Sequence, residues 1–183
     1  MIARGEALAA LTGSWMLARR QPAGLAFFND SRAGFVRSFW AVALAAPFEL
    51  GLQALVGDFA LGADLLRALI VLAVALVADA VAFPLLMAPI TTELGCGDRW
   101  VLFVVAYNWS GLLRIAIFTP VALLTLLVPA LHPLLITVMV LLLAYQAYVA
   151  HVSLAVSPLT AGGTVLLAVL VDTVIGLAAA RLF

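Results

Sequence analysis

The chain has 183 residues, of which 67% are hydrophobic and 10% are charged. A soluble globular domain is roughly 45–50% apolar and about 25% charged, so this composition excludes a water-soluble fold. Nine arginines balance nine acidic residues, and a net charge of zero leaves no basic surface for nucleic acid. The apolar residues suffice for five spans of about 20 residues each. The sequence therefore predicts an all-α, polytopic transmembrane helical bundle.

Residues 1–30 are expected to form a cytoplasmic or interfacial amphipathic segment ahead of this bundle. Leu8, Leu11 and Trp15 recur at the spacing of one helical face. A helix of this kind lies in the membrane interface with its apolar face toward the lipid. Pro22 is expected to break the helix, and Ser31 is placed to cap the next one.

Residues 31–183 are predicted to form a five-helix transmembrane domain. The predicted spans are, in chain order, 35–56, 65–87, 100–127, 134–156 and 164–182. Pro84 and Pro89 are expected to bend or end the second span, and Pro120 to kink the third. Residues 157–163 are expected to form a loop because they combine serine, proline and glycine.

The placement of arginine predicts the orientation of the chain in its membrane. Five arginines precede or open the first span, whereas Asp58 and Asp64 lead the loop that follows it; the five are Arg4, Arg19, Arg20, Arg32 and Arg37. Positive residues favour the cytoplasmic side, so the N-terminus is predicted to be cytoplasmic. The absence of lysine together with frequent Ala, Leu, Val and Arg suggests GC-rich coding. We therefore expect a bacterial inner (cytoplasmic) membrane.

Four charged residues, Glu49, Asp79, Arg114 and Asp172, fall well inside the predicted spans. An ionised side chain at that depth costs roughly 2.5–3.5 kcal/mol, so each is expected to face protein or water. Two of them belong to rows of small or polar residues spaced four apart, which are Ala41, Ala45, Glu49 and Gln53 in the first span and Thr164, Ala168, Asp172 and Gly176 in the fifth. Small residues let helices approach closely. These rows therefore predict the faces that form the bundle interior.

Three carboxylates share the single guanidinium of Arg114, so full ionisation would leave about two uncompensated negative charges in a low dielectric. In one interpretation, a carboxylate clamps Arg114 and the other acids carry protons and fix the helix register. In a second, a water-filled cavity enters the bundle and provides a proton or substrate path. In a third, one acid is interfacial. Asn108 completes the predicted intramembrane polar network.

The chain is predicted not to be an enzyme. Residues 108–111, Asn-Trp-Ser-Gly, partly resemble the Gly-x-Ser-Gly motif of rhomboid proteases, and His151 is a conceivable base. Asn108 replaces the glycine of that motif, and no oxyanion site is identifiable. Cys96 with two histidines cannot build a cysteine-rich metal site, so neither a metal nor a cofactor is expected.

The segment Ala26-Phe27-Phe28-Asn29-Asp30 leads into Gly34-Phe35-Val36-Arg37-Ser38-Phe39-Trp40, and five closely spaced spans follow. This layout, over about residues 30–183, resembles the Yip (Ypt-interacting protein) family. The resemblance is one of topology, and it implies a non-enzymatic protein that organises membranes or binds partners. No functional residue is carried over from that family.

The leading hypothesis is a non-enzymatic integral membrane protein that serves as a scaffold or accessory subunit of a membrane complex. Its partners would be the lipid bilayer and other membrane-protein subunits or further copies of the same chain. The alternative is a small proton-coupled permease that uses Glu49, Asp79 and Asp172 around Arg114.

Overall fold

The computed structural model describes residues 4–56 and 63–181, and within these ranges the chain is helical with no strand. Asp58 and Leu182, which belong to the predicted orientation and to the predicted fifth span, lie outside the described residues. The elements in chain order are α1 (Arg4–Ala18), η1 (Pro22–Phe27), α2 (Arg32–Val56), α3 (Ala63–Glu93), η2 (Gly97–Arg99), α4 (Trp100–Leu127), η3 (Pro129–Leu131), α5 (His132–Leu154) and α6 (Pro158–Ala180).

Five helices of the described part, α2 to α6, are long and apolar enough to cross a membrane. α3 has 31 residues, which at a rise of about 1.5 Å per residue exceeds the hydrocarbon thickness of about 30 Å. The predicted all-α transmembrane bundle is therefore confirmed as a fold class. The chain is an integral membrane protein.

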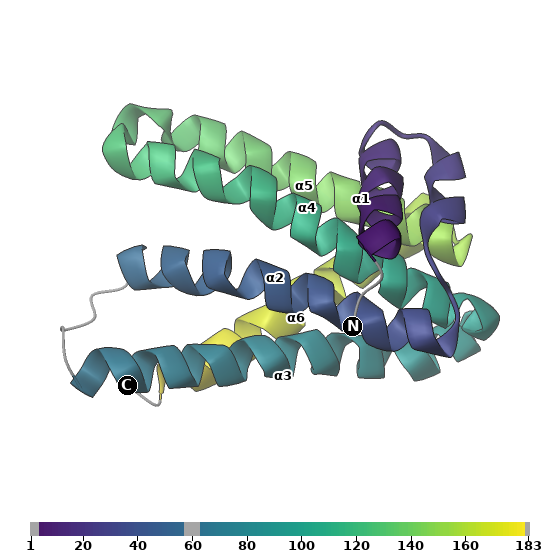
Figure 1. Ribbon diagram of the computed structural model, residues 1–183, viewed down its shortest axis with the longest axis horizontal. Coiled ribbons are helices and arrows are strands. Elements are labelled where there is room, and N and C mark those ends of the chain that lie inside the picture. The colour runs from purple at the N-terminus through teal and green to yellow at the C-terminus, as the bar shows by residue number, and fades with distance from the viewer. Residues whose placement is uncertain (1–3, 57–62, 182–183) are drawn as a thin grey trace.

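The five spanning helices alternate in direction, and α4 is central among them (Figure 1). α4 packs against α2 and α5, while α6 packs against α5 and α3. One end of the bundle gathers the N-termini of α2, α4 and α6 with the C-termini of α3 and α5. α1 crosses the spanning helices at a steep angle near this end (Figure 1).

The burial of α4 changes along its length and divides the bundle into two halves. Of residues 103–110 all but Tyr107 are buried, so helices surround α4 on all sides there. Later in the helix, burial narrows to one face formed by Ile115, Thr119, Ala122 and Thr125. We call the region around residues 103–110 the packed half. The open half is the region of the bundle beyond Gly111 of α4.

Two hydrophobic clusters form the core of the packed half. One contains Phe83, Met87, Phe103, Ala150, Leu154 and Ala161, and the other contains Ala10, Leu17, Phe28, Ala41, Trp109 and Val149. They bring all five spanning helices together with α1 and the residue that follows η1. The apolar side chains of the packed half therefore interlock, and this end of the bundle is closed.

α1 rests against α4 and α5 through the buried residues Ala10, Ser14 and Leu17. The hydroxyl of Tyr145 donates to the carbonyl oxygen of Ser14 at 2.9 Å, which fixes α1 on α5. Trp15 is exposed, as a residue facing lipid or interface would be. The steep crossing of α1 is the orientation expected for a helix that lies along a membrane surface.

The ion pair between Arg37 Nε and Glu6 Oε2, 2.7 Å apart, adds a second link from α1 to the bundle. At the start of α2 the predicted cap is present, since the backbone N–H of Gly34 donates to Ser31 Oγ at 3.1 Å. These two polar contacts set where the N-terminal segment ends and the first span begins.

Two sequence-based boundaries are wrong. α3 does not end near Met87 but continues through Pro84 and Pro89 to Glu93. A proline removes one backbone hydrogen bond, but it does not end a helix that packing holds in place. Phe83 and Met87 are both buried in the core. The carbonyl oxygen of Pro84 also accepts a hydrogen bond from Trp100 Nε1 at 3.0 Å, which ties α3 to the start of α4.

The predicted loop 157–163 is instead the first turn and a half of α6, which begins at Pro158. Ser157 caps the helix, because its Oγ accepts from the backbone N–H of Thr160 at 3.1 Å. Proline is favoured at the first helical position, so serine followed by proline is a start signal here. Gly162 and Gly163 lie exposed inside the helix.

Candidate functional site

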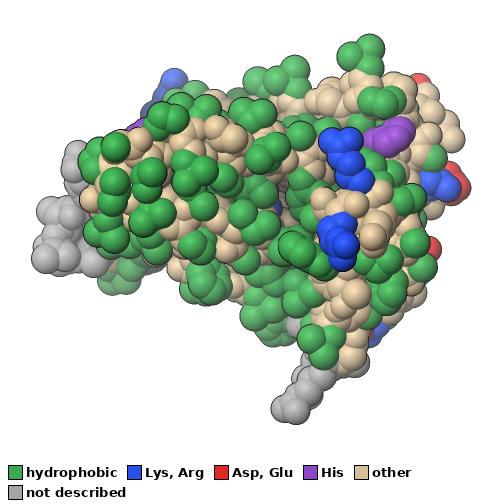
Figure 2. All heavy atoms as spheres, turned by 90° about the horizontal axis from the view of Figure 1, so that it is seen from above, with side chains coloured by type: hydrophobic (Ala, Val, Ile, Leu, Met, Phe, Trp, Pro, Cys, Tyr) green, Lys and Arg blue, Asp and Glu red, His purple; other side chains and the backbone are tan. Residues whose placement is uncertain are grey.

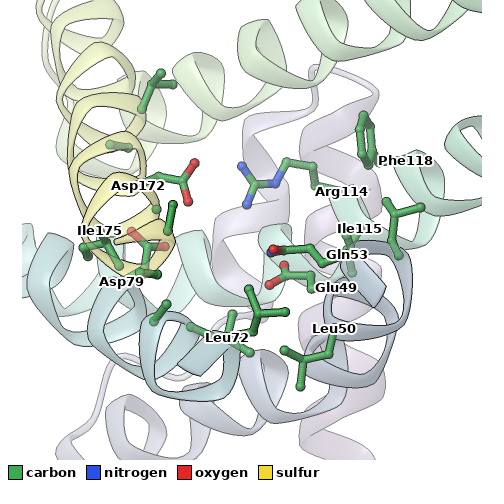
Figure 3. A pocket seen from close by; sticks show the side chains of 18 of the residues that line it. Glu49, Leu50, Gln53, Leu72, Asp79, Arg114, Ile115, Phe118, Asp172 and Ile175 are labelled. Atoms are coloured by element: carbon green, nitrogen blue, oxygen red, sulfur yellow. The ribbon is translucent and has the colours of Figure 1, made fainter. Parts of the chain in front are cut away.

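The open half contains a polar cavity of about 610 Å³, and all five spanning helices contribute to its wall (Figure 3). Its polar lining consists of Glu49 and Gln53 from α2, Asp79 from α3, Tyr107 and Arg114 from α4, Gln146 from α5, and Asp172 from α6. The four intramembrane charges predicted from the sequence are therefore gathered around one space. A volume of this size is typical of sites for small molecules.

The rows of small residues explain how these side chains reach the cavity. On α2, Ala41 and Ala45 are buried, and one and two turns further on Glu49 and Gln53 line the cavity. A residue every fourth position stays on one slowly drifting face of a helix, so the row begins in the core and ends in the open space.

α6 repeats this arrangement from another side of the bundle. Thr164 and Ala168 are buried, and Asp172 and Gly176 follow on the same face as part of the cavity wall. Because α2 and α6 both start at the closed end, their acids open into the same region.

Arg114 is bonded to an amide and not to a carboxylate. Its Nη1 donates to Gln146 Oε1 at 3.0 Å, and Gln146 is only 2% exposed. Among the described residues, the ion pair of α1 with α2 is the only contact within 4.0 Å between an arginine and a carboxylate. Arg114 and Asp172 nevertheless point toward one another across the space (Figure 3). The expected Arg–carboxylate clamp is thus replaced by an Arg–Gln hydrogen bond and an open cavity.

The three acids of the cavity do not form one cluster. In the part of the chain that the structure describes, no group of three His, Cys, Asp or Glu side chains is close enough to hold a metal ion. In Figure 3, Asp79 and Asp172 lie on one side of the space and Glu49 lies on the other. The acids therefore present acceptor oxygens at two places in the cavity wall.

A smaller cavity of about 70 Å³ adjoins the main one and reaches toward the packed half. Asn108 lies in its wall, and its Nδ2 donates to Ser38 Oγ at 2.9 Å. Asn108 therefore ties α4 to α2 and does not line the main cavity. Its role as a helix–helix contact agrees with the general use of buried amides in membranes.

Three aromatic rings stand between the cavities and the core. The ring centroids of Phe83 and Tyr107 are 4.8 Å apart, those of Phe103 and Tyr107 5.6 Å, and those of Phe83 and Phe103 6.0 Å. Aromatic pairs at such spacings attract one another beyond their burial. This aromatic cluster (Phe83, Phe103, Tyr107) closes the inner end of the cavity.

Sequence reasoning did not assign Tyr107 to the site. A signal was present, because Tyr107 precedes Arg114 by seven residues and so lies on the same face of α4. Gln146 was identifiable only as a lone polar residue at membrane depth. Gln146 bonds to Arg114 in place of an acid because α5 packs against α4. The spacing of residues in the sequence does not predict this packing.

The residues considered for catalysis or metal binding, which are Ser110, His151 and Cys96, do not line the cavity. Nδ1 of His151 contacts the carbonyl oxygen of Val156 at 2.5 Å, and no hydrogen bond joins it to Ser110 among the described residues. Cys96 is buried in the connection between α3 and η2. Burial raises the pKa of the Cys96 thiol, and the nearby carboxylate of Asp98 raises it further.

No protein-family model, curated protein or solved structure matches this chain.

Proposed function

We propose that the protein is a small permease that binds a polar solute in the cavity of the open half and couples its movement to protons. The main support for this proposal is the cavity itself. Four helices each contribute a charged side chain to its wall, and the fifth contributes the amide of Gln146. Ionisable residues in a membrane are costly and commonly mark substrate or proton paths. A purely structural role would be expected to pair these charges directly.

The charge of the cavity supports proton coupling. Three carboxylates face one guanidinium, so the ionised site carries a formal charge of −2. Bringing a proton or a cation to the cavity relieves this excess. Binding of the solute and binding of protons are therefore expected to influence one another.

The distribution of arginine supports a direction of opening. Arg19, Arg20, Arg32 and Arg99 belong to the segments at the closed end of the bundle. In Figure 2, most charged side chains on the face shown gather toward one end, and apolar side chains cover the rest. Positive residues favour the cytoplasm, so we place the closed end and the N-terminus there. The cavity then opens toward the opposite side of an inner membrane.

Transport through this arrangement requires the closed end to open. The aromatic cluster separates the cavity from that end, and it is the natural inner barrier. Movement of α3 relative to α4 would part Phe83 from Phe103 and Tyr107. This is the rigid-body gating expected of alternating access.

A flux assay tests the permease. Purified protein is reconstituted into liposomes that enclose a pH-sensitive dye, and panels of amino acids, amines, carboxylic acids and sugars are added outside. We expect one class to change the internal pH. Asp79→Asn and Asp172→Asn should abolish the signal while folding normally, and the exposed Asp98→Asn serves as the matched control. No response to any class, or full activity in both Asn variants, would contradict the proposal.

A scaffold or accessory subunit, in line with the Yip-like layout, is the second candidate. It is favoured by α3 and α6, because only 11% of the residues in the most apolar stretch of each helix are buried within the chain. Mass spectrometry after purification in a gentle detergent separates the two candidates. A stoichiometric partner protein favours the scaffold, whereas recovery of the chain alone or as a homo-oligomer favours the permease.

A further inference from the structure

The polar groups of the cavity divide into a donor side and an acceptor side. Arg114 of α4, held by Gln146 of the neighbouring helix α5, supplies hydrogen-bond donors. Glu49, Asp79 and Asp172, from α2, α3 and α6, supply carboxylate oxygens. In Figure 3 the guanidinium of Arg114 faces Asp172 across the open space, and Glu49 lies near Gln53 on the same side as Arg114.

On the donor side, Gln146 holds the guanidinium of Arg114 in place. Oε1 of Gln146 accepts from Arg114 Nη1 at 3.0 Å, and Nε2 of Gln146 is buried out of reach of the cavity. The Arg114 side chain lines the cavity, and the acceptor that suits a guanidinium best is a carboxylate.

The acceptor side calls for the opposite chemistry. In the described part of the chain none of the three cavity acids is ion-paired, hydrogen-bonded or close enough to two others to share a metal ion. Carboxylates at two places in the wall, Asp79 with Asp172 on one side and Glu49 on the other, are matched by two ammonium groups of one molecule. Because the acids outnumber Arg114 by two, a ligand with more positive than negative charge fits best.

Resting on the proposed function, we infer that the substrate is a basic amino acid: a small zwitterion with a second ammonium group. Its carboxylate binds the Nη atoms of Arg114, and its two ammonium groups bind the acids of α2, α3 and α6. The wall residues Tyr107 and Phe118 add ring faces that attract a cation. The volume of about 610 Å³ accommodates such a molecule.

Isothermal titration of the full-length protein in detergent tests this assignment with four matched probes. Ornithine carries one carboxylate and two ammonium groups. Norvaline lacks the side-chain amine, 1,4-diaminobutane lacks the carboxylate, and pentanoate lacks both amines. We expect ornithine to bind tightest and each of the other three to bind about tenfold more weakly or worse, because each leaves a charged group of the cavity unpaired.

Two variants test which side of the cavity binds the carboxylate and which side binds the ammonium groups. Gln146→Leu should weaken ornithine binding and leave 1,4-diaminobutane unchanged, because it removes the side chain that holds Arg114 in place for the carboxylate. Asp172→Asn should reduce the preference for ornithine over norvaline. Asp98→Asn, outside the cavity, should change neither. Circular dichroism and gel-filtration profiles check that each variant is folded.

Equal binding of 1,4-diaminobutane, norvaline or pentanoate, or no binding of ornithine, would overturn the substrate class. The permease proposal is decided separately by the flux assay. If another class of solute drives flux while ornithine does not bind, the substrate class is wrong and the permease stands. If ornithine binds without flux, the site is correct and transport is not.

Discussion

The packed half and the open half are built from the same helices, and two of these carry the same four-residue rows through both. In the packed half, rows of alanine and threonine meet large side chains such as Phe103 and Trp109, which fill the space between helices. In the open half, the continuing rows present Glu49 and Asp172, and no large residue fills the space between them. Close packing therefore stabilises one end of the bundle, and the polar site occupies the other.

The difference shows how a small membrane protein accommodates costly charges. A charge that faced lipid or a dry core would oppose insertion. A space large enough for water or a solute lowers that cost, provided that the other half of the bundle holds the helices together. α1 and the aromatic cluster strengthen only the packed half.

The largest expected effect comes from Phe103, which is fully buried in the packed half. Phe103→Ala leaves a cavity in the core and should lower the free energy of unfolding by about 3–5 kcal/mol. Phe118→Ala, at the wall of the open half, should cost far less because the space beside it is already empty. Unfolding in increasing concentrations of SDS measures both; equal costs would contradict the division into two halves.

A smaller effect is expected where α1 meets η1. A Cβ added to Gly13 would lie 2.6 Å from the carbonyl oxygen of Gly24, so Gly13→Ala should push the two segments apart. We expect a loss of about 1–3 kcal/mol in the same unfolding experiment.

Gly51→Ala is the matched control for this contact. Gly51 lies in α2 with nothing within 4 Å of an added Cβ, so alanine there should be neutral or stabilising by about 0.5–1 kcal/mol. If both alanine variants were neutral, α1 would not be a fixed part of the packed half.

The smallest effect concerns reactivity and not stability. Because burial raises the pKa of Cys96, a smaller fraction of its thiol is ionised at neutral pH than for an ordinary cysteine. The thiolate is the reactive form. Labelling by maleimide should therefore be slow at pH 7 and accelerate as the pH rises past the ordinary thiol value.

Leu94→Cys in a Cys96→Ala background provides the exposed comparison, since Leu94 is 44% exposed in the same connection. It should label faster than native Cys96 at pH 7. Equal rates would show that the closed end is looser than the packing indicates.

The amino-acid sequence predicts the class of fold and the faces of the helices, but not the space between them. Composition and length predict five spans, and the row through Ala45 and Glu49 predicts which face of α2 points inward. The start of α6 was missed because Ser157 and Pro158 signal a loop and a helix start equally well. The partner of Arg114 could not be predicted, because it depends on the distances between four helices.

The most direct test is whether water reaches the cavity, and α6 offers two positions for it that lie two residues apart. Gly176 lines the cavity with open space around it, whereas Val174, 65% exposed, lies about 200° around the helix. In liposomes and a Cys96→Ala background, Gly176→Cys should react with a charged, membrane-impermeant methanethiosulfonate, and Val174→Cys, facing lipid, should not. Failure of Gly176→Cys to react, or equal reaction at both positions, would contradict a water-filled cavity in the open half.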